Sequence, residues 1–148
     1  LINNKGSKSV DYFHKKLGKI MWNKCGMARN KKDLESAISE ISKLRKEFWK
    51  EVKVPGDQNE FNEELAKAGR VADFLELGEL FAKDALEREE SCGGHFREEY
   101  QTKEGEATRK KEFQFVSAWE YVGEPRDAIL HKEKLGYKNI EVKERSYK

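Results

Sequence analysis

Three successive stretches of this chain carry apolar residues at steps of three and four, which is the spacing of one face of an α-helix. The stretches run over about residues 8–25, 31–52 and 58–90, and glycine or proline separates each from the next. Short links of this kind join antiparallel neighbours. The sequence therefore predicts a mainly α fold: an antiparallel, spectrin-repeat-like three-helix bundle over residues 1–100, followed by an irregular tail, residues 101–148, with short β-strands.

Polar residues before each stretch predict where the helices begin. The expected caps are, in chain order, Ser7 or Ser9, then Asn30 with Asp33, then Asp57 with Glu60 at the spacing of a capping box. At 1.5 Å per residue the helices would be about 27, about 33 and nearly 50 Å long, so the third should extend beyond the bundle. Its apolar stripe begins at Phe61, and Gly69 and Gly78 interrupt it, which predicts close helix contacts or a bend.

Charge and composition fit amphipathic helices and exclude several other classes. Charged residues make up 39% of the chain and apolar ones 36%, but the apolar residues are periodic and 11% of the chain is aromatic, which argues against disorder. Residues 1–54 hold fourteen Lys/Arg against six Asp/Glu, and residues 57–106 hold six against fifteen. These segments are expected to attract each other within the fold, so nucleic-acid binding is not expected.

No apolar run approaches the ~20 residues of a membrane span, and no signal peptide is visible, so direct membrane insertion is not expected. The two cysteines, Cys25 and Cys92, are expected to be free thiols.

The tail after residue 100 has a different pattern. Apolar and polar residues alternate from Phe113 to Trp119, which predicts a short strand. A turn signal follows at residues 123–125, and residues 129–131 and 140–142 are two further strand candidates. Because the tail is too sparse to fold alone, we expect it to pack on the bundle or on a part of the protein not included in this sequence.

The segment 88–100 is the most unusual in the chain and the first place to look for function. Its two adjacent glycines permit close approach of a partner or ligand, and His95 and Arg97 are able to hold an anion. The competing interpretation, a helix end whose polar residues dock onto a neighbouring domain, is favoured. Cys92 and His95 are spaced like half of a zinc site, but no second pair is evident, and no third group would orient them for nucleophilic catalysis.

Other candidate chemistry is weaker still. Met21, Trp22 and Trp49 are interpreted as core or interface packing. The adjacent carboxylates of residues 89–90 and 98–99 point apart, which suits acid–base catalysis poorly. Dinucleotide, P-loop and nucleophile-elbow motifs are absent. The sequence therefore assigns no catalytic, cofactor-binding or metal-binding residue.

Beyond its composition, the chain resembles one protein family. The pattern Arg88-x-Glu90-Ser91-x-Gly93-x-His95-x-Arg97 is similar to the segment after the last long helix of succinate dehydrogenase and fumarate reductase flavoprotein subunits. Further similarities, in the same order as in that family, are Met21-Trp22-x-x-x-Gly26-x-x-Arg29, Phe61-Asn62-x-x-Leu65 and the closing Arg145-Ser146-Tyr147. The chain departs from the family at Cys92, where many members carry Arg, and at Gly94, where they carry Ala or Leu.

The resemblance implies a C-terminal structural and docking domain that is itself inactive and holds no cofactor. The intact subunit would bind FAD, interconvert succinate and fumarate, and pass electrons to quinone through two partners, an iron–sulfur subunit followed by a membrane anchor. The nearest partners would be the FAD-binding and capping domains of the same polypeptide, and the location the cytoplasmic face of the bacterial inner membrane. The residues implied in docking, or in supporting flavin attachment, are Arg88, Glu90, Ser91, His95, Arg97 and Tyr100.

Two other hypotheses stay open. One is a stand-alone helical adaptor that binds a protein through its helix faces. The other is the C-terminal domain of an L-aspartate oxidase, against which the Arg145-Ser146-Tyr147 ending and the long tail weigh. The isolated chain is also expected to self-associate through its docking face. The direction of the reaction is not set by the sequence, because one active site runs both ways.

Overall fold

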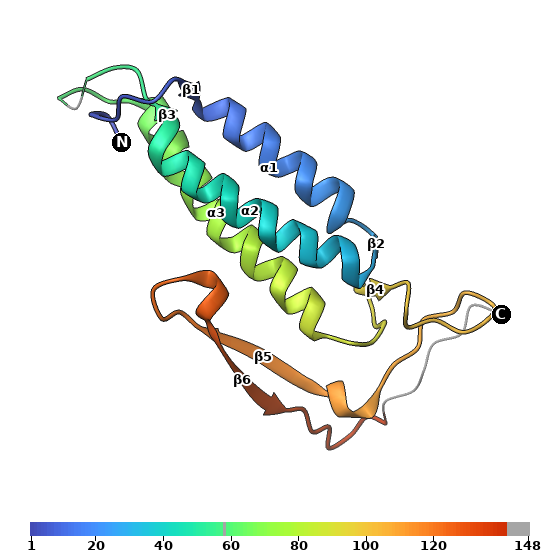
Figure 1. The fold of residues 1–148 in the computed structure, drawn as a ribbon. Helices are drawn as coiled ribbons and strands as arrows, with labels where there is room; N and C mark the ends of the chain where they lie inside the picture. Colours follow the sequence, from blue (N-terminus) through green and yellow to red (C-terminus); the bar gives the residue numbers. More distant parts are fainter. Residues whose placement is uncertain (58, 142–148) are drawn as a thin grey trace.

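The structure is a computed structural model that describes residues 1–57 and 59–141. Three long helices form the predicted antiparallel bundle: α1 (Val10–Lys24), α2 (Lys31–Glu51) and α3 (Glu63–Glu87). Figure 1 shows them side by side, with the chain reversing direction at each end of the bundle. At one end, β1 (Lys8–Ser9) pairs in parallel with β3 (Val52–Lys53). At the other end, β2 (Ala28–Arg29) pairs in parallel with β4 (Phe96–Arg97).

Two of the three predicted helix starts are confirmed. The Ser9 side chain accepts a hydrogen bond from the backbone N–H of Tyr12 at 3.2 Å, and Asn30 accepts one from Asp33 at 2.9 Å. These bonds satisfy amide groups that have no partner within a helix.

The third helix is shorter at both ends than the expected residues 58–90. Asn62 is its cap and accepts from the Leu65 amide at 3.0 Å, while Asp57 instead accepts from the Asn59 amide in the preceding loop. The Asn62 side-chain amide also donates to the Pro55 carbonyl, which folds that loop onto the helix start. The helix ends at Glu87 because Arg88 is extended (φ −82°, ψ 94°). Phe61, the expected first residue of the apolar stripe, lies outside the helix and is 89% exposed.

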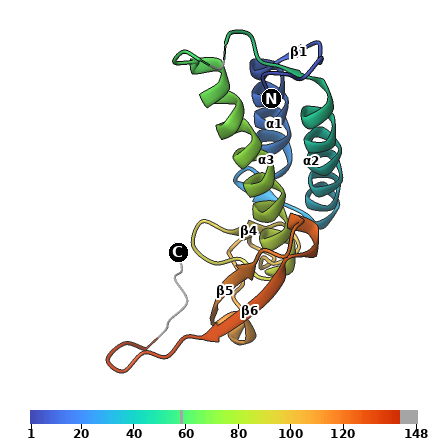
Figure 2. The ribbon, with the colours of Figure 1, turned by 90° about the vertical axis from the view of Figure 1, so that its left-hand side faces the viewer.

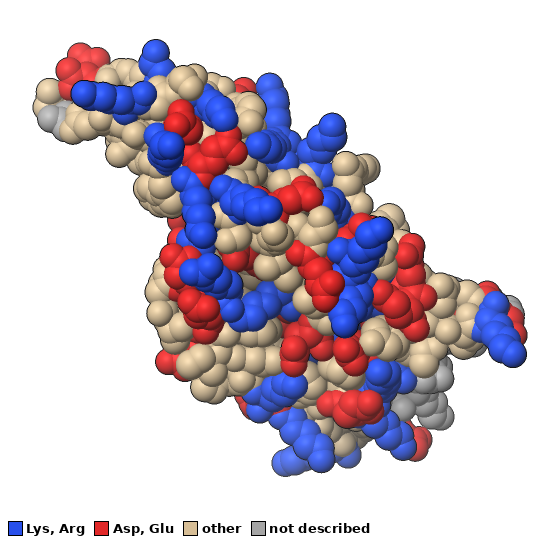
Figure 3. All heavy atoms as spheres, viewed as in Figure 1, with Lys and Arg blue, Asp and Glu red and all other residues tan. Residues whose placement is uncertain are grey.

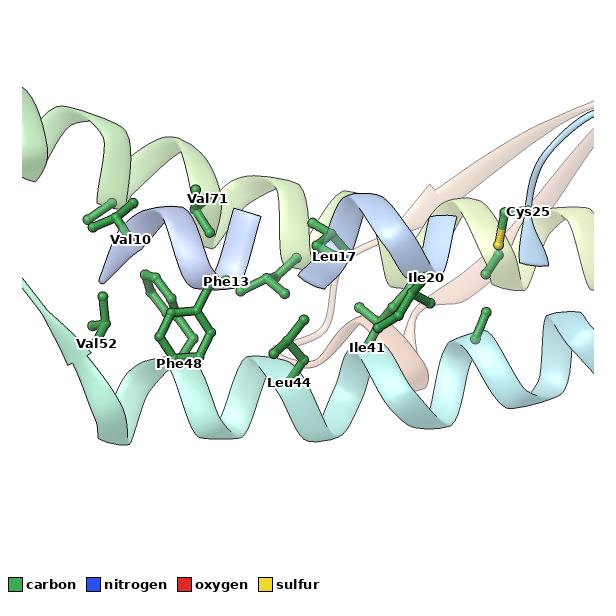
Figure 4. Close-up of a cluster of buried hydrophobic side chains, with 14 of the residues drawn as sticks. Val10, Phe13, Leu17, Ile20, Cys25, Ile41, Leu44, Phe48, Val52 and Val71 are labelled. Carbon is green, nitrogen blue, oxygen red and sulfur yellow. The ribbon is translucent and has the colours of Figure 1, made fainter. Parts of the chain in front are cut away.

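The core lies where the three apolar stripes meet, and Figure 4 shows side chains from the helices pointing toward one another there. Phe13 and Phe48 pack edge to face, with ring centroids 5.2 Å apart, and both are fully buried. Each such side chain contributes about 1.5–3 kcal/mol when it leaves water. The core also includes Val10, Leu17, Ile20, Cys25, Leu34, Ala37, Ile41, Leu44, Val52, Ala68, Val71, Leu75, Ala82 and Ala85.

Charge is distributed differently from the expectation. Figure 3 shows basic and acidic side chains interspersed over one face of the molecule. Within residues 1–57 and 59–141, the ion pairs that join the basic first segment to the acidic second segment all involve Arg45. The lysines of the first segment pair with acids of their own segment, as Lys24 does with Glu40. Charged residues of amphipathic helices point outward, so most of them cannot reach across the core.

The tail forms a hairpin of β5 (Phe115–Glu120) and β6 (Ile129–Lys134), preceded by the 3-10 turn η1 (Lys111–Phe113) and joined through the 3-10 turn η2 (Pro125–Asp127). Figure 2 shows the hairpin beside the C-terminal part of α3. The first two predicted strands are confirmed. The third, at residues 140–142, is not formed at Ile140 and Glu141, and Val142 lies outside the described residues. Ile140 is 70% exposed and has no strand partner to stabilise it there.

The two glycines of α3 differ in their surroundings. A Cβ at Gly78 would lie 3.4 Å from both Leu17 Cδ1 and Met21 Sδ of α1, whereas a Cβ at Gly69 would meet nothing within 4 Å. The predicted close helix contact therefore exists at Gly78.

We expect Gly78→Leu to lower the free energy of unfolding by about 1–3 kcal/mol, because the added side chain forces α1 and α3 apart. The matched variant Gly69→Leu is expected to leave stability unchanged or raise it by up to about 1 kcal/mol through helix propensity. Urea unfolding followed by circular dichroism measures both. Equal effects of the two substitutions would show that Gly78 is not a point of close packing.

Candidate functional site

The segment 88–100 does not extend beyond the bundle as expected but folds back across its end. Cys92 and His95 exchange backbone hydrogen bonds of 2.8 and 3.0 Å around a two-residue turn, in which Gly93 has a φ of 58°. That left-handed conformation favours glycine. Strand β4 then pairs with β2, and the Glu98 amide donates to the Arg29 carbonyl at 2.8 Å. The polar motif is thus a layer on the end of the bundle.

Arg97 is the centre of this layer. The residue is 1% exposed, and its Nη1 donates to the carbonyls of Ala85 at 2.9 Å and Leu86 at 3.1 Å. These carbonyls belong to the last turn of α3, which carries no basic residue of its own. A cation there satisfies orphan carbonyls and complements the negative end of the helix dipole.

Glu98 and Glu99 place negative charge at the opposite kind of helix end, the start of α2. Glu99 accepts from the Lys31 amide through one carboxylate oxygen and from Arg97 Nε at 3.0 Å through the other. Glu98 accepts from the Asn30 side chain at 3.1 Å. Carboxylates are stabilising at a helix N-terminus, and here they also neutralise the buried arginine. The pKa of Glu99 lies below its usual range despite partial burial, because the Lys31 amide and Arg97 favour the charged form.

Arg88, Glu90 and Ser91 join this layer to the tail. Arg88 donates to Glu90 at 2.9 Å and to the carbonyls of Phe113 and Phe115, both at 3.1 Å. The second Glu90 oxygen accepts from the Lys110 amide at 3.0 Å. Ser91 Oγ donates to the Arg97 carbonyl and accepts from the Arg97 amide at 2.8 Å.

His95 completes the arrangement. Its Nδ1 lies 2.9 Å from Arg29 Nη1, and its Nε2 lies 2.9 Å from the Arg88 carbonyl. Arginine only donates hydrogen bonds, so Nδ1 accepts and the ring is neutral, with its proton on Nε2. Burial, together with the charges of Arg29, Arg97 and Arg88, lowers the pKa of His95 below its ordinary value.

The structure thus brings together the six residues that the sequence singled out. The sixth, Tyr100, lies beneath the ammonium group of Lys110, whose Nζ is 4.3 Å from the centroid of the tyrosine ring. Sequence reasoning noted Arg29 only as part of the family pattern and gave it no role in this layer. Arg29 also donates to the carbonyls of Cys25 and Gly26 at the end of α1. Sequence reasoning also missed Arg45. This charged residue lies four positions after Ile41, on the apolar face of the predicted helix, and that unusual position could have revealed it.

The polar side chains of this layer are bonded mainly to the protein's own backbone and to each other, an arrangement that holds helix ends in place. Cys25 and Cys92 are free thiols, as expected. Within the described part of the chain, no three His, Cys, Asp or Glu side chains are grouped as they would be to hold a metal ion. The same part of the chain contains no helix that is long and apolar enough to cross a membrane.

The fold is a helical bundle domain with a polar end layer, and comparison with known proteins shows its family. The family model for the fumarate reductase flavoprotein C-terminus matches residues 14–147. The chain therefore belongs to this family, as the motif of residues 88–97 predicted.

The relatives are fumarate reductase subunits and an L-aspartate oxidase, all much longer than this chain. One fumarate reductase (CoM/CoB) subunit, from Methanothermobacter marburgensis, is 34% identical over 106 residues, which cover 68% of this chain and 19% of that protein. The fumarate reductase flavoprotein subunit of Haemophilus influenzae is 28% identical over 100 residues, or 68% of this chain and 16% of that protein. An L-aspartate oxidase of Synechocystis is 27% identical over 101 residues, or 60% of this chain and 18% of that protein. The chain thus spans less than a fifth of these relatives.

The fold recurs in a solved structure of E. coli quinol fumarate reductase. The TM-score is 0.79 at 21% identity, and the match covers 95% of this chain and 23% of that one.

The neutral His95 makes stability depend on pH in a defined direction. Because its pKa is lower in the folded protein than the ~6.5 of an unfolded histidine, the unfolded state takes up the proton first as the pH falls. We expect the free energy of unfolding to fall as the pH drops below about 6.5. The contribution of His95 to this fall ends once its ring is also protonated in the folded protein. Urea unfolding between pH 7.5 and 5 measures this. His95→Gln should reduce the dependence and the exposed control His14→Gln should not. An unchanged dependence in His95→Gln would contradict the neutral, arginine-bonded ring.

Proposed function

We propose that this chain is the C-terminal structural and docking domain of a fumarate reductase or succinate dehydrogenase flavoprotein subunit. In the intact subunit, the remaining domains bind FAD and interconvert succinate and fumarate. This domain braces them and contributes no catalytic residue. The family match and the self-contained hydrogen bonding of segment 88–100 support this assignment.

The observation that carries the docking role is the outer face of α3. Its inner face packs in the core, yet Phe74, Leu77 and Phe81 on the outside are 44%, 60% and 45% exposed. A helix that is apolar on both sides is typical of one buried on both sides. Trp22 and Met27, at and beyond the end of α1, add to the exposed apolar surface at 84% and 92%. We propose that the FAD-binding and capping domains cover this face. In the isolated chain the same face would promote self-association.

Arg88 and Arg97 are proposed to support flavin attachment indirectly. Arg97 is buried, and both its Nε and Nη1 are bonded within the domain, so its effect on a flavin would pass through the position of the end layer. Arg88 would act in the same way by fixing the tail hairpin. Glu90, Ser91, His95 and Tyr100 hold these two arginines in place.

The wider assembly follows from the same assignment. The parent subunit would pass electrons to an iron–sulfur subunit, then through a membrane anchor to or from quinone, on the cytoplasmic face of the bacterial inner membrane. The likeness to an L-aspartate oxidase favours one second candidate, the equivalent domain of such an enzyme.

Mixing this chain with the separately produced FAD-binding and capping domains tests the proposal. We expect the domains to associate, with a change in flavin fluorescence and a rise in succinate-driven dye reduction, while the chain alone shows neither signal. Dye reduction driven by L-aspartate instead of succinate would identify the second candidate.

Replacing Phe74, Leu77 and Phe81 together by Ser should abolish association, because it removes the apolar surface that the partner covers. Trp49→Ser, an exposed aromatic on α2, is the matched control and should associate normally. No association between two folded partners would contradict the docking role and bring the stand-alone adaptor hypothesis to the front.

A further inference from the structure

A groove lies between α3 and the loop that follows β5. Its volume is about 410 Å³, and its lining is mainly apolar. Leu77 and Leu80 line it from α3, and Trp119 and Tyr121 line it from the tail. Asp73 and Glu76, also on α3, add two carboxylates to the lining.

The tail side of the groove is fixed to the bundle by polar contacts, so the groove exists before anything binds. Lys83 Nζ donates to the carbonyls of Arg126 at 2.8 Å and Ala128 at 2.9 Å. Trp119 Nε1 donates to Asp84 at 2.8 Å. Glu124 accepts a hydrogen bond from the buried Arg45 of α2.

Negative charge exceeds positive charge around this groove. One guanidinium, that of Arg45, faces three carboxylates: Glu124, Glu79 at 3.4 Å and Glu76 at 4.0 Å. Glu79 is 1% exposed, and neither of its carboxylate oxygens has a hydrogen-bond partner within the described residues.

Two of the nearby cations, Lys83 and Arg126, are already engaged within the domain. The ammonium of Lys83 is bonded to carbonyls and lies over the Trp119 ring, and Arg126 pairs with Asp127 at 3.8 Å. Asp73 forms no ion pair in the part of the chain that the structure describes. Excess carboxylates beside low-dielectric walls concentrate a negative potential.

We propose that the groove receives an arginine or lysine side chain, flanked by apolar residues, from a segment of a partner protein. The aromatic ring of Tyr121, which is 60% exposed, attracts a cation over its face. The carboxylates of Asp73 and Glu76 pair with its charged head, and the leucines pack against its aliphatic stem. An acidic ligand would be repelled, and a purely apolar one would partly desolvate both carboxylates and leave Asp73 without a cation. This inference does not depend on the identity of the parent protein.

Binding of a short peptide to the full chain tests the proposal, with Trp119 fluorescence as the signal. Trp22→Phe and Trp49→Phe, both at exposed positions, leave Trp119 as the sole tryptophan. The probe is a peptide with one arginine between two leucines. Its control carries citrulline, the neutral isostere, in place of arginine. We expect the arginine peptide to produce a saturable change that weakens with added salt, and the citrulline peptide to produce little.

Substitutions test whether the arginine peptide binds in this groove. Asp73→Asn combined with Glu76→Gln should weaken the arginine peptide by about tenfold or more, because its charge-assisted contacts are lost. Glu133→Gln, an exposed acid on β6, should leave affinity unchanged, and circular dichroism checks that each variant is folded. Equal binding of the two peptides, no effect of the double substitution, or no saturable response would each overturn the proposal. A Trp119 change that depends on protein concentration without peptide, and that persists when Phe74 and Phe81 are both replaced by Ser, would identify a second copy as the occupant and would overturn the proposal as well.

Discussion

The arrangement of this domain depends on one buried cation, the guanidinium of Arg97. It bonds the last carbonyls of α3, and through Glu99 it is connected to the first amide of α2. Two helix ends of opposite polarity therefore meet across a single arginine–glutamate pair, each receiving the charge that its dipole favours. A buried arginine without its carboxylate would be costly, so the burial of Arg97 depends on Glu99. The backbone of residues 96–98 is then in place to pair with β2 and close the end of the bundle.

The tail depends on the same layer. A two-stranded hairpin is marginal in water by itself, and β5–β6 is held by contacts from outside it. Arg88 bonds the backbone at its start, while Lys83 and Arg45 hold the loop at its far end. The hairpin is thus fixed to the bundle at both of its ends, and α3 keeps an apolar outer face. The relatives extend far beyond the part that this chain spans.

The sequence predicted the bundle and the resemblance to the family because both are local patterns. Apolar periodicity places Phe13 and Phe48 in the core, and capping residues such as Asn30 fix two helix starts. The start of α3 was predicted too early in the sequence because Asp57 and Asn62 are both suitable capping residues. Asn62 also donates to the Pro55 carbonyl, and the spacing of residues in the sequence does not reveal this contact. The motif residues were found, but their roles depend on contacts between distant segments. The bond between Arg29 and His95 joins residues that are 66 positions apart in the sequence.

The most direct test of this account is hydrogen exchange in Arg97→Lys, which keeps the charge but loses the guanidinium fork. The amides of Arg88, Ser91 and Glu98, which bond to Asp84, Thr108 and Arg29, should lose protection together, while amides near Val52 at the opposite end of the bundle stay protected. Arg126→Lys, at an exposed arginine, should change none of them. Loss of protection confined to residues 97–100 would contradict the account, because it would show that the helix ends and the tail do not depend on Arg97.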